Sequence, residues 1–370
     1  MKQNFFALVM RSINCNRVIE YIHNQWMKKG LISNILYPAS YITKSFLFIK
    51  NYLYKIKMLR IFRARVPVIV VGNIYIGGTG KTPVVISITK ELKSRGWEPG
   101  VISRGYGIDV GDRPKVGCKN VCFSEFGDEP TLITKKTGAP ISVHPKRDIA
   151  IKSLLHNFPN INIIISDDGL QHVSMARDFE IIVQDNRMIG NGRLIPSGPL
   201  REQTVRLNQA NTIVNNRINY EEMQETNIYL QENRPYTINM YLKPEFAYNI
   251  SGLEKDFPIS YFNCNNYYKK IVALSGIGNN ERFIKTLNDC WIYPSSYIKL
   301  KDHCKFDKSL FYNISADAIL ITSKDAVKCL NYEDPRIWEI SVDAEFSDKF
   351  FFNYLSNQMY QASMKLKDHL

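Results

Sequence analysis

A glycine-rich turn followed by a lysine and a threonine is the stretch of this sequence best suited to chemistry. It lies within residues 66–82, VPVIVVGNIYIGGTGKT. Glycines can adopt backbone angles closed to other residues, so the chain can curl with its N–H groups pointing into one concavity that suits phosphate. Lys81 would place an ammonium group near the β- and γ-phosphates of a nucleotide, and the Thr82 hydroxyl would ligate Mg²⁺. We predict a phosphate-binding loop formed by Gly72, Asn73, Gly77, Gly78, Thr79, Gly80, Lys81 and Thr82.

The loop departs from the strict Walker A pattern at one position. That pattern has a glycine five residues before Gly80, and Tyr75 stands there instead. A glycine-rich turn that binds nothing is the alternative, but it leaves the lysine and the threonine at the required offset before a helix unexplained. We therefore interpret the stretch as a variant P-loop.

Two adjacent acids follow a second aliphatic run. Residues 161–165 are almost wholly aliphatic and lead to Asp167 and Asp168, in the sequence SDDGLQH. A carboxylate held at the tip of a buried strand is the Walker B arrangement, in which it binds the Mg²⁺ of the nucleotide. The alternative is an ordinary turn, because Asp and Gly favour turns for reasons unconnected with metal.

A further pair of acids, Asp128 and Glu129, stands in the sequence FGDEP. An acid just before proline at the start of a short helix is an ordinary cap. Paired carboxylates near a polyphosphate can instead divide two roles, one binding metal and the other accepting a proton. These residues alone leave both interpretations open.

Several arginines stand where a ligand would meet the predicted sheet. Arg104 follows a strand expected at 99–103, so it would point into the crevice where parallel sheets bind ligands; a turn with an exposed arginine is the alternative. Arg193 and Arg201 lie on a loop rich in glycine and proline and could face phosphate. Arg147, in PKRD, is a further basic candidate, for which plain surface charge is the alternative.

The elements that must position these residues alternate along the chain. Consecutive β-branched residues over 68–71 predict a buried strand of a parallel sheet, and apolar residues recur at helical spacing over 84–92. Further strands are expected at 99–103, 161–165, 179–183 and 211–215. Strands that alternate with helices predict an α/β fold, with a P-loop core built on a doubly wound, mainly parallel sheet.

A second, smaller α/β unit is expected after a polar linker over 216–233. Its pattern begins with a strand at residue 271, in IVALSGIGN, and ends with a strand over 318–322. His303 lies in a polar loop between them, where an isolated histidine is most often structural. We expect three parts: an N-terminal segment 1–60, a nucleotide-binding domain 61–233 and a C-terminal domain 234–370.

Positive charge is concentrated near the N-terminus. The chain has 370 residues and a formal net charge of +13, and residues 1–60 hold ten Lys or Arg against one acid. Such a segment could bind nucleic acid or an anionic membrane surface, and the apolar content of residues 32–54 favours a helix lying in a membrane interface. An ordinary core helix with a basic outer face is the alternative.

Other features of the sequence indicate the cellular compartment of the protein. Charges interrupt residues 32–54 too often for a confident membrane span, and the small-residue cleavage site of a signal peptide is missing. The seven cysteines are scattered without a CxxC pair, so neither a zinc site nor a disulfide framework is suggested. A reducing cytosol fits this pattern.

Taken as a set, the motifs resemble those of the tetraacyldisaccharide 4'-kinase family, the lipid A 4'-kinases of Gram-negative bacteria. Each motif is weak alone, but eight in register are specific, and the resemblance covers residues 26–338. In order they are GNIYIGGTGKTPVV, SRGYG, GDEP, DDGLQH, GNGRLIPSGPLRE, ALSGIGN, DH and SKDAVK.

The resemblance implies a kinase that transfers the γ-phosphate of ATP, with Mg²⁺, to the 4'-hydroxyl of tetraacyldisaccharide 1-phosphate. It implies two α/β/α domains joined by a β-ribbon hinge, and an amphipathic N-terminal helix on the membrane. The enzyme would lie at the cytoplasmic face of the bacterial inner membrane, against anionic lipids, as a monomer with no nucleic-acid partner.

Matching the family pattern residue by residue implies roles for side chains of this sequence. Two positions depart from it: Ser323 stands where glutamate is usual, and Lys305 lies in a divergent segment after the histidine. The implied roles are phosphate and Mg²⁺ binding by Lys81 and Thr82, catalysis by Asp128 with His303 as its partner, metal binding by Glu129, Asp167 and Asp168, and phosphate contact by Arg147 and Arg201.

Two rival interpretations come from other classes. GGTGKT also resembles the loops of partitioning and metal-insertion switch ATPases, but those usually carry a lysine just before the glycines, where this chain has Ile76. The non-enzymatic rival is a membrane-surface scaffold with a degenerate nucleotide fold. The intact Lys81, Thr82, Asp167 and Asp168 argue against such decay.

Overall fold

The computed structural model describes residues 24–119, 121–224, 235–253, 256–264, 268–302, 304, 306–329 and 332–368. Its residues pack into two units. The P-loop unit comprises the described residues of Ile22–Tyr241 together with those of Ala344–Leu370, and the second unit comprises the described residues of Leu242–Asp343. The predicted domains 1–60, 61–233 and 234–370 stay predictions.

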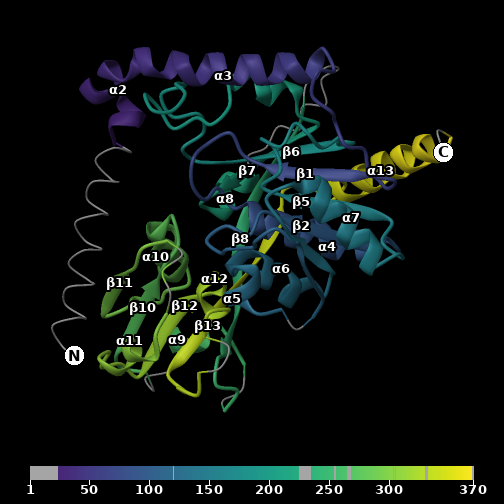
Figure 1. Ribbon diagram of the computed structural model, residues 1–370. Coiled ribbons are helices and arrows are strands. Elements are labelled where there is room, and N and C mark those ends of the chain that lie inside the picture. Colours follow the sequence, from purple (N-terminus) through teal and green to yellow (C-terminus); the bar gives the residue numbers. More distant parts are fainter. Residues whose placement is uncertain are drawn as a thin grey trace. The chain divides into compact units, whose positions relative to one another are not determined.

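The sheet of the P-loop unit is built around β1 (Val68–Gly72), which is parallel to β5 (Ile163–Asp167) on one side and to β6 (Phe179–Asp185) on the other (Figure 1). Its β3 runs antiparallel to β4, and the other pairings are parallel. The remaining strands are β2 (Pro99–Ser103), β3 (Lys115–Gly117), β4 (Ile141–Val143), β7 (Thr212–Arg217) and the first half of β8 (Tyr236–Asn249), in the order β8-β7-β6-β1-β5-β2-β4-β3.

Both faces of this sheet are covered, which is why β1 can consist of consecutive apolar residues. Val68 and Val70 pack in one cluster with Ala150, Ile151 and Leu154 of α7 (Arg147–Asn157). Ile69 and Val71, which alternate with them, point to the other face and are also fully buried. The helix α4 (Lys81–Ser94) packs on β1, β2 and β5, and α6 (Asp128–Thr137) packs on α4. Shorter helices are α5 (Phe123–Phe126), η1 (Thr204–Gln209) and α8 (Tyr220–Gln224).

The chain enters the P-loop unit through two helices, α2 (Leu31–Ile35) and the longer α3 (Tyr37–Lys55) (Figure 1). Side chains of these helices form hydrogen bonds with the glycine- and proline-rich loop. Ser33 Oγ donates to the Ser197 carbonyl at 2.5 Å, and Thr43 Oγ1 donates to the Ile195 carbonyl at 2.7 Å. Among the described residues, no helix is long and apolar enough to cross a membrane.

The last helix, α13 (Phe351–Lys367), returns to the P-loop unit. It packs on α4, and its Tyr354 ring stacks on Tyr236 of β8 and meets Phe179 of β6 edge-on. The P-loop unit is therefore assembled from two stretches of chain that are far apart in sequence.

The second unit contains parallel strands in the order β11-β10-β12-β13. Its aromatic core centres on Trp338, which is fully buried. Together with the P-loop unit it confirms the predicted α/β class and mainly parallel sheet, whereas the predicted hinge stays a prediction. Its elements are β9 (Phe257–Pro258), α9 (Tyr261–Cys264), β10 (Ile271–Ser275), α10 (Asn280–Asp289), β11 (Ser296–Lys299), α11 (Lys308–Tyr312), β12 (Ala318–Thr322), α12 (Ser323–Ala326) and most of β13 (Ile337–Phe346).

Candidate active site

The glycine-rich turn leaves β1 and curls into the first turn of α4. Gly77 and Gly80 have φ angles of 93° and 92°, in the left-handed region that other residues rarely adopt. A Cβ atom on Gly80 would lie 2.1 Å from the Asn216 side-chain nitrogen, so this position admits only glycine on both grounds. The curl predicted for residues 72–82 is therefore present.

Three successive carbonyls of this loop are each held by one side chain. Asn73 Nδ2 donates to Gly77 O at 3.1 Å, Arg187 Nη2 to Gly78 O at 2.7 Å, and Asn216 Nδ2 to Thr79 O at 2.9 Å. In a trans peptide the C=O and the N–H point in opposite directions. Holding these carbonyls therefore turns the next three N–H groups, of residues 78–80, away from the side chains that hold them.

Two of those three side chains were not predicted from the sequence, because Arg187 and Asn216 lie far along the chain from the loop. Asn73, predicted to bind nucleotide, is fully buried and uses its amide within the loop, where Nδ2 also donates to Thr79 Oγ1 at 3.1 Å. Gln171, from the DDGLQH motif, donates to the Asn73 carbonyl at 3.0 Å. The motif thus contacts the P-loop through more than its two acids.

The first residue of α4, Lys81, faces the second acid of that motif. Its Nζ lies 3.4 Å from Oδ1 of Asp168, and Arg201 Nη1 lies 3.3 Å from the other carboxylate oxygen. Burial would raise the pKa of Asp168, but the charges and hydrogen bonds of Lys81 and Arg201 lower it overall. Asp168 has a φ of 47°, which Asp tolerates better than most residues, and it is ionised between two cations.

The first acid, Asp167, lies at the tip of β5 beside Val71 of β1. It is almost fully buried, and neither carboxylate oxygen has a hydrogen-bond partner among the described residues. Burial raises its pKa to about 7, with the negative charges of Glu129 and Asp168 adding to the effect. A buried carboxylate without donors is a group that a bound cation would stabilise.

This donor set fits Mg²⁺. Magnesium is usually held by one or two carboxylates, with phosphate and water completing the shell, so it does not need a cage of protein ligands. Among the described residues, no group of three or more His, Cys, Asp and Glu side chains could hold a metal. The partnerless Asp167 carboxylate, with Glu129 close enough to act on its charge, matches the smaller ligand set.

The four predicted arginines lie in four different settings. Arg147 is buried, and its guanidinium donates to the carbonyls of His144 at 3.1 Å and Asp167 at 3.0 Å, so it braces the β5 tip from inside. Burial lowers the pKa of Arg147 to about 10, against the opposing charge of Asp167. Arg104 is exposed, and the Arg193 guanidinium is stacked on Tyr37 of α3. Arg201 faces Asp168, as described above.

Asp128 and Glu129 form the first turn of α6, where negative charge is favourable to the helix dipole. Asp128 is buried, and the Glu129 charge acts on Asp167, so this helix end lies close to the β5 tip. The N-cap residue of α6 is Gly127, without a side-chain cap hydrogen bond, so neither acid is the cap, and the functional interpretation remains compatible with their place in the first turn. Their catalytic and metal roles stay predictions, as do those of Thr82 and Arg147.

His303 lies outside the described residues, as does Lys305. In the second unit the structure describes Ser323, the first residue of α12, whose hydroxyl donates to the Ile340 carbonyl at 3.3 Å. Serine is thus accommodated by a backbone contact where the family pattern has glutamate.

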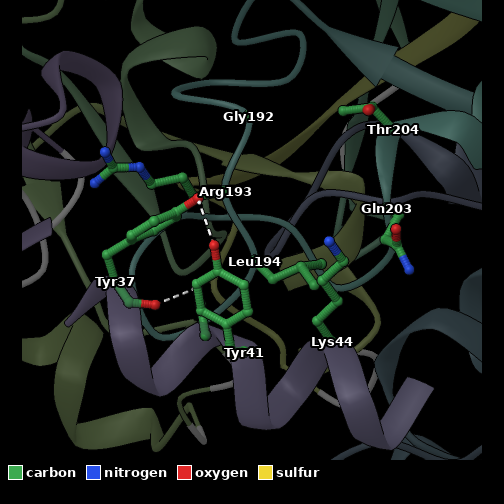
Figure 2. A pocket seen from close by; sticks show the side chains of 9 residues that line it. Tyr37, Tyr41, Lys44, Gly192, Arg193, Leu194, Gln203 and Thr204 are labelled. Carbon is green, nitrogen blue, oxygen red and sulfur yellow. Dashed lines mark hydrogen bonds between the residues drawn. The ribbon is translucent and has the colours of Figure 1, made fainter. Parts of the chain in front are cut away.

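A hollow of about 180 Å³ lies between α3 and the glycine- and proline-rich loop. Figure 2 shows the Tyr37 and Tyr41 rings rising from α3, with their hydroxyls 3.3 Å apart and Lys44 one turn further along the helix. The hollow is polar and basic, and it opens beside a helix that exposes large apolar side chains, Ile42 at 74% and Phe46 at 65%. It is lined by Tyr37, Ser40, Tyr41, Lys44, Gly192, Arg193, Leu194, Gln203 and Thr204.

Comparison with known proteins decides the family. A family model described as tetraacyldisaccharide-1-P 4'-kinase matches residues 32–360. The chain is 43% identical over 345 residues to a tetraacyldisaccharide 4'-kinase of Bordetella petrii, covering 93% of this chain and 96% of that protein. The chain belongs to the tetraacyldisaccharide-1-P 4'-kinase family. Membership confirms the family and the kinase class predicted from the motifs, in lipid A biosynthesis, and gives no support to the switch ATPase.

Other members of the family agree with this assignment. A tetraacyldisaccharide 4'-kinase of Actinobacillus succinogenes is 38% identical over 326 residues, covering 88% of this chain and 94% of that protein. A crystal structure of LpxK from Aquifex aeolicus, in complex with ATP, superposes with a TM-score of 0.73 at 25% identity, over 90% of this chain and 99% of that one. The kinase fold described above is therefore shared with a solved member of the family.

Proposed function

We propose that the chain transfers the γ-phosphate of ATP to the 4'-hydroxyl of tetraacyldisaccharide 1-phosphate. The observation that carries this proposal is the meeting of the P-loop with both acids of the β5 tip, where Lys81 and Arg201 flank Asp168. ATP as the phosphate donor is supported by the complex of the Aquifex aeolicus protein with ATP. Family membership supports the lipid disaccharide as the acceptor.

Phosphoryl transfer asks the protein mainly for positioning and charge neutralisation, because the loose transition state spreads charge over the equatorial oxygens. We assign Lys81 and Arg201 to the phosphate oxygens, with the loop N–H groups beneath them. Thr82, Asp167, Asp168 and Glu129 are the residues that would hold Mg²⁺. When bound, Mg²⁺ would neutralise part of the phosphate charge.

A sugar hydroxyl is a poor nucleophile at neutral pH, so a carboxylate within hydrogen-bond reach would help by accepting its proton. We assign this role to Asp128, which lies buried at the start of α6 near the acids of the β5 tip. The proton passes from the 4'-hydroxyl to the Asp128 carboxylate as the oxygen attacks the γ-phosphorus, and the bond between that phosphorus and the β–γ bridging oxygen breaks to release ADP. His303 as the partner of Asp128 is part of the same proposal and rests on the family resemblance.

We place the lipid on the α3 side of the P-loop unit, at the cytoplasmic face of the bacterial inner membrane. Ile42, Phe46 and Ile49 share one face of α3 and are at least half exposed. Lysines at positions 44 and 55 of the same helix favour anionic lipids. The four acyl chains would stay in the bilayer, because extracting them costs about 0.8 kcal/mol per methylene.

The test is an assay of purified protein with labelled ATP, Mg²⁺ and tetraacyldisaccharide 1-phosphate in anionic liposomes. We expect label on the lipid and none without Mg²⁺. Hydrolysis of ATP that does not depend on the lipid would support a switch ATPase instead, and inertness with all three components would support a scaffold.

A further inference from the structure

Arg187 has no role in the function proposed above, yet its guanidinium donates to the carbonyl of Gly78 in the P-loop. It follows the carboxyl end of β6, the strand that borders β1 on the side away from β5. The guanidinium is therefore on the opposite flank of the loop from Asp168. Its contact with Gly78 O, at 2.7 Å, is the shortest of the three side-chain bonds to the loop carbonyls.

Asp185 fixes the Arg187 side chain independently of its contact with the loop. Nε lies 3.0 and 2.9 Å from the two carboxylate oxygens of Asp185, and Nη2 lies 2.6 Å from Oδ2 of the same residue. The backbone N–H of Arg187 donates to Asp185 as well, at 3.0 Å. A planar guanidinium held by a fork of this kind loses little further freedom when it donates a fourth bond.

The Arg187 guanidinium also packs against an aromatic ring, that of Tyr75. Tyr75 is 2% exposed, and the Arg187 guanidinium carbon lies 4.5 Å from the centroid of its ring. Tyr75 is the residue that occupies the glycine position of the strict Walker A pattern. The side chain that makes the loop a variant is thus the platform on which Arg187 rests.

We propose that Arg187, anchored by Asp185 and stacked on Tyr75, is a positioning residue that holds the Gly78 peptide so that the following N–H faces the phosphates of ATP. Arg187 is not proposed to contact the nucleotide itself. It contacts the outer side of the loop and acts on the nucleotide through the Gly78 peptide. This proposal rests on the proposed function in taking ATP as the ligand. It predicts a defect in nucleotide binding that is separate from lipid binding.

The experiment compares Arg187→Ala, Arg187→Lys and Arg336→Ala with the full-length wild type. Arg336 is the matched control: it too has an Asp two residues before it, which its Nε and Nη2 contact at 2.9 and 2.6 Å, and it too donates to backbone carbonyls. The readouts are the Kd of Mg–ATP by calorimetry without lipid, the KM for the lipid, and the melting temperature.

We expect Arg187→Ala to raise the Kd of Mg–ATP about tenfold, the usual loss for a hydrogen bond to a charged group. Arg187→Lys should recover part of the affinity, since lysine can reach the carbonyl but cannot form the fork. The KM for the lipid should stay within about twofold, and Arg336→Ala should lower the melting temperature at least as much without changing the Kd. An unchanged Kd in Arg187→Ala, or an equal rise in both alanine variants, overturns the proposal.

The test of the Arg187 proposal can be distinguished from the test of the proposed kinase function. A wild type that binds Mg–ATP but transfers no phosphate to the lipid would refute the kinase assignment, while the comparison of Kd values would still decide the role of Arg187. A wild type that phosphorylates the lipid while Arg187→Ala binds Mg–ATP normally would refute the positioning role alone.

Discussion

The ammonium nitrogen of Lys81 lies 3.4 Å from Oδ1 of Asp168. The P-loop lysine is thus paired with the acid that we assign to the metal. A triphosphate arriving with Mg²⁺ would give the lysine and the acid each a new partner of opposite charge. Exchange of partners of this kind keeps either charge from standing alone at any stage.

Replacing Lys81 with alanine should lower kcat about 10²–10³-fold, the usual effect of removing one preorganised donor from developing charge. The control is Lys93→Ala, which removes a lysine from the last turn of the same helix, where its ammonium group donates to the Thr137 carbonyl. Steady-state phosphorylation of the lipid measures both. Equal rates for the two variants would remove Lys81 from the chemistry.

Asp167→Asn should weaken Mg²⁺ binding about tenfold or more, because a partnerless buried carboxylate becomes neutral. The same change should stabilise the metal-free protein. Burial raises the pKa of Asp167 to about 7, so at pH 8 the wild-type carboxyl is ionised in the folded state. Ionising it there costs more free energy than in the unfolded chain, which lowers the free energy of unfolding of the wild type. Magnesium titration of activity and melting curves at pH 8 measure the two effects. A metal-free variant less stable than the wild type would contradict the assignment.

His172 should make the protein less stable as the pH falls from about 6.5 to 4. Burial, with the positive charges of Arg147, Arg104 and Lys50, lowers the pKa of His172 to about 4, whereas the unfolded chain has its ordinary value. The unfolded state therefore binds more protons across this window, and stability is lost as the pH falls. Relative to His172→Gln, the wild type should lose about 1–3 kcal/mol, measured by urea unfolding at pH 7.5 and 4.5. Parallel losses in the two proteins would rule the effect out.

Asp128→Ala should lower kcat about 10²–10⁴-fold while the Kd of Mg–ATP changes little, as expected for a proton acceptor. The control is Asp148→Ala, which removes an acid from the first turn of α7 just as Asp128 lies in the first turn of α6. If Asp128 only stabilises its helix, the two variants will behave alike, with small losses of melting temperature and normal turnover.

The double variant Ile42→Ser and Phe46→Ser should leave anionic liposomes in a flotation assay, since each exposed side chain contributes about 1.5–3 kcal/mol when buried in an apolar phase. Trp291→Ser is the control, because Trp291 is 72% exposed and lies in the second unit. Melting temperatures should be unchanged in both. Retention of the double variant on liposomes would remove α3 from the membrane contact.

Local sequence patterns predict much of the scaffold. The strands at 99–103 and 318–322 match β2 and β12 to the residue, because buried aliphatic runs between turn residues leave few other choices. The P-loop and the acids of the β5 tip are recognisable for a similar reason: each needs particular residue types at fixed offsets. The amphipathic spacing after the loop likewise predicts α4.

The residues that hold the P-loop carbonyls cannot be predicted from such patterns. Arg187 lies 109 residues from Gly78, and Asn216 lies 137 residues from Thr79. Asn216 is assigned from composition to the start of a linker, since asparagine is uncommon in strands, but it is fully buried in β7. Its place is set by the tertiary contact with the loop, which a one-dimensional pattern does not contain.

The return of α13 to the P-loop unit has a consequence for biosynthesis. A ribosome making this protein must polymerise the entire second unit before residues 351–367 exist to cover their part of α4, β6 and β8. Until then the nascent P-loop unit exposes apolar surface that the finished protein hides. The P-loop unit therefore cannot complete its packing until the second unit has been synthesised.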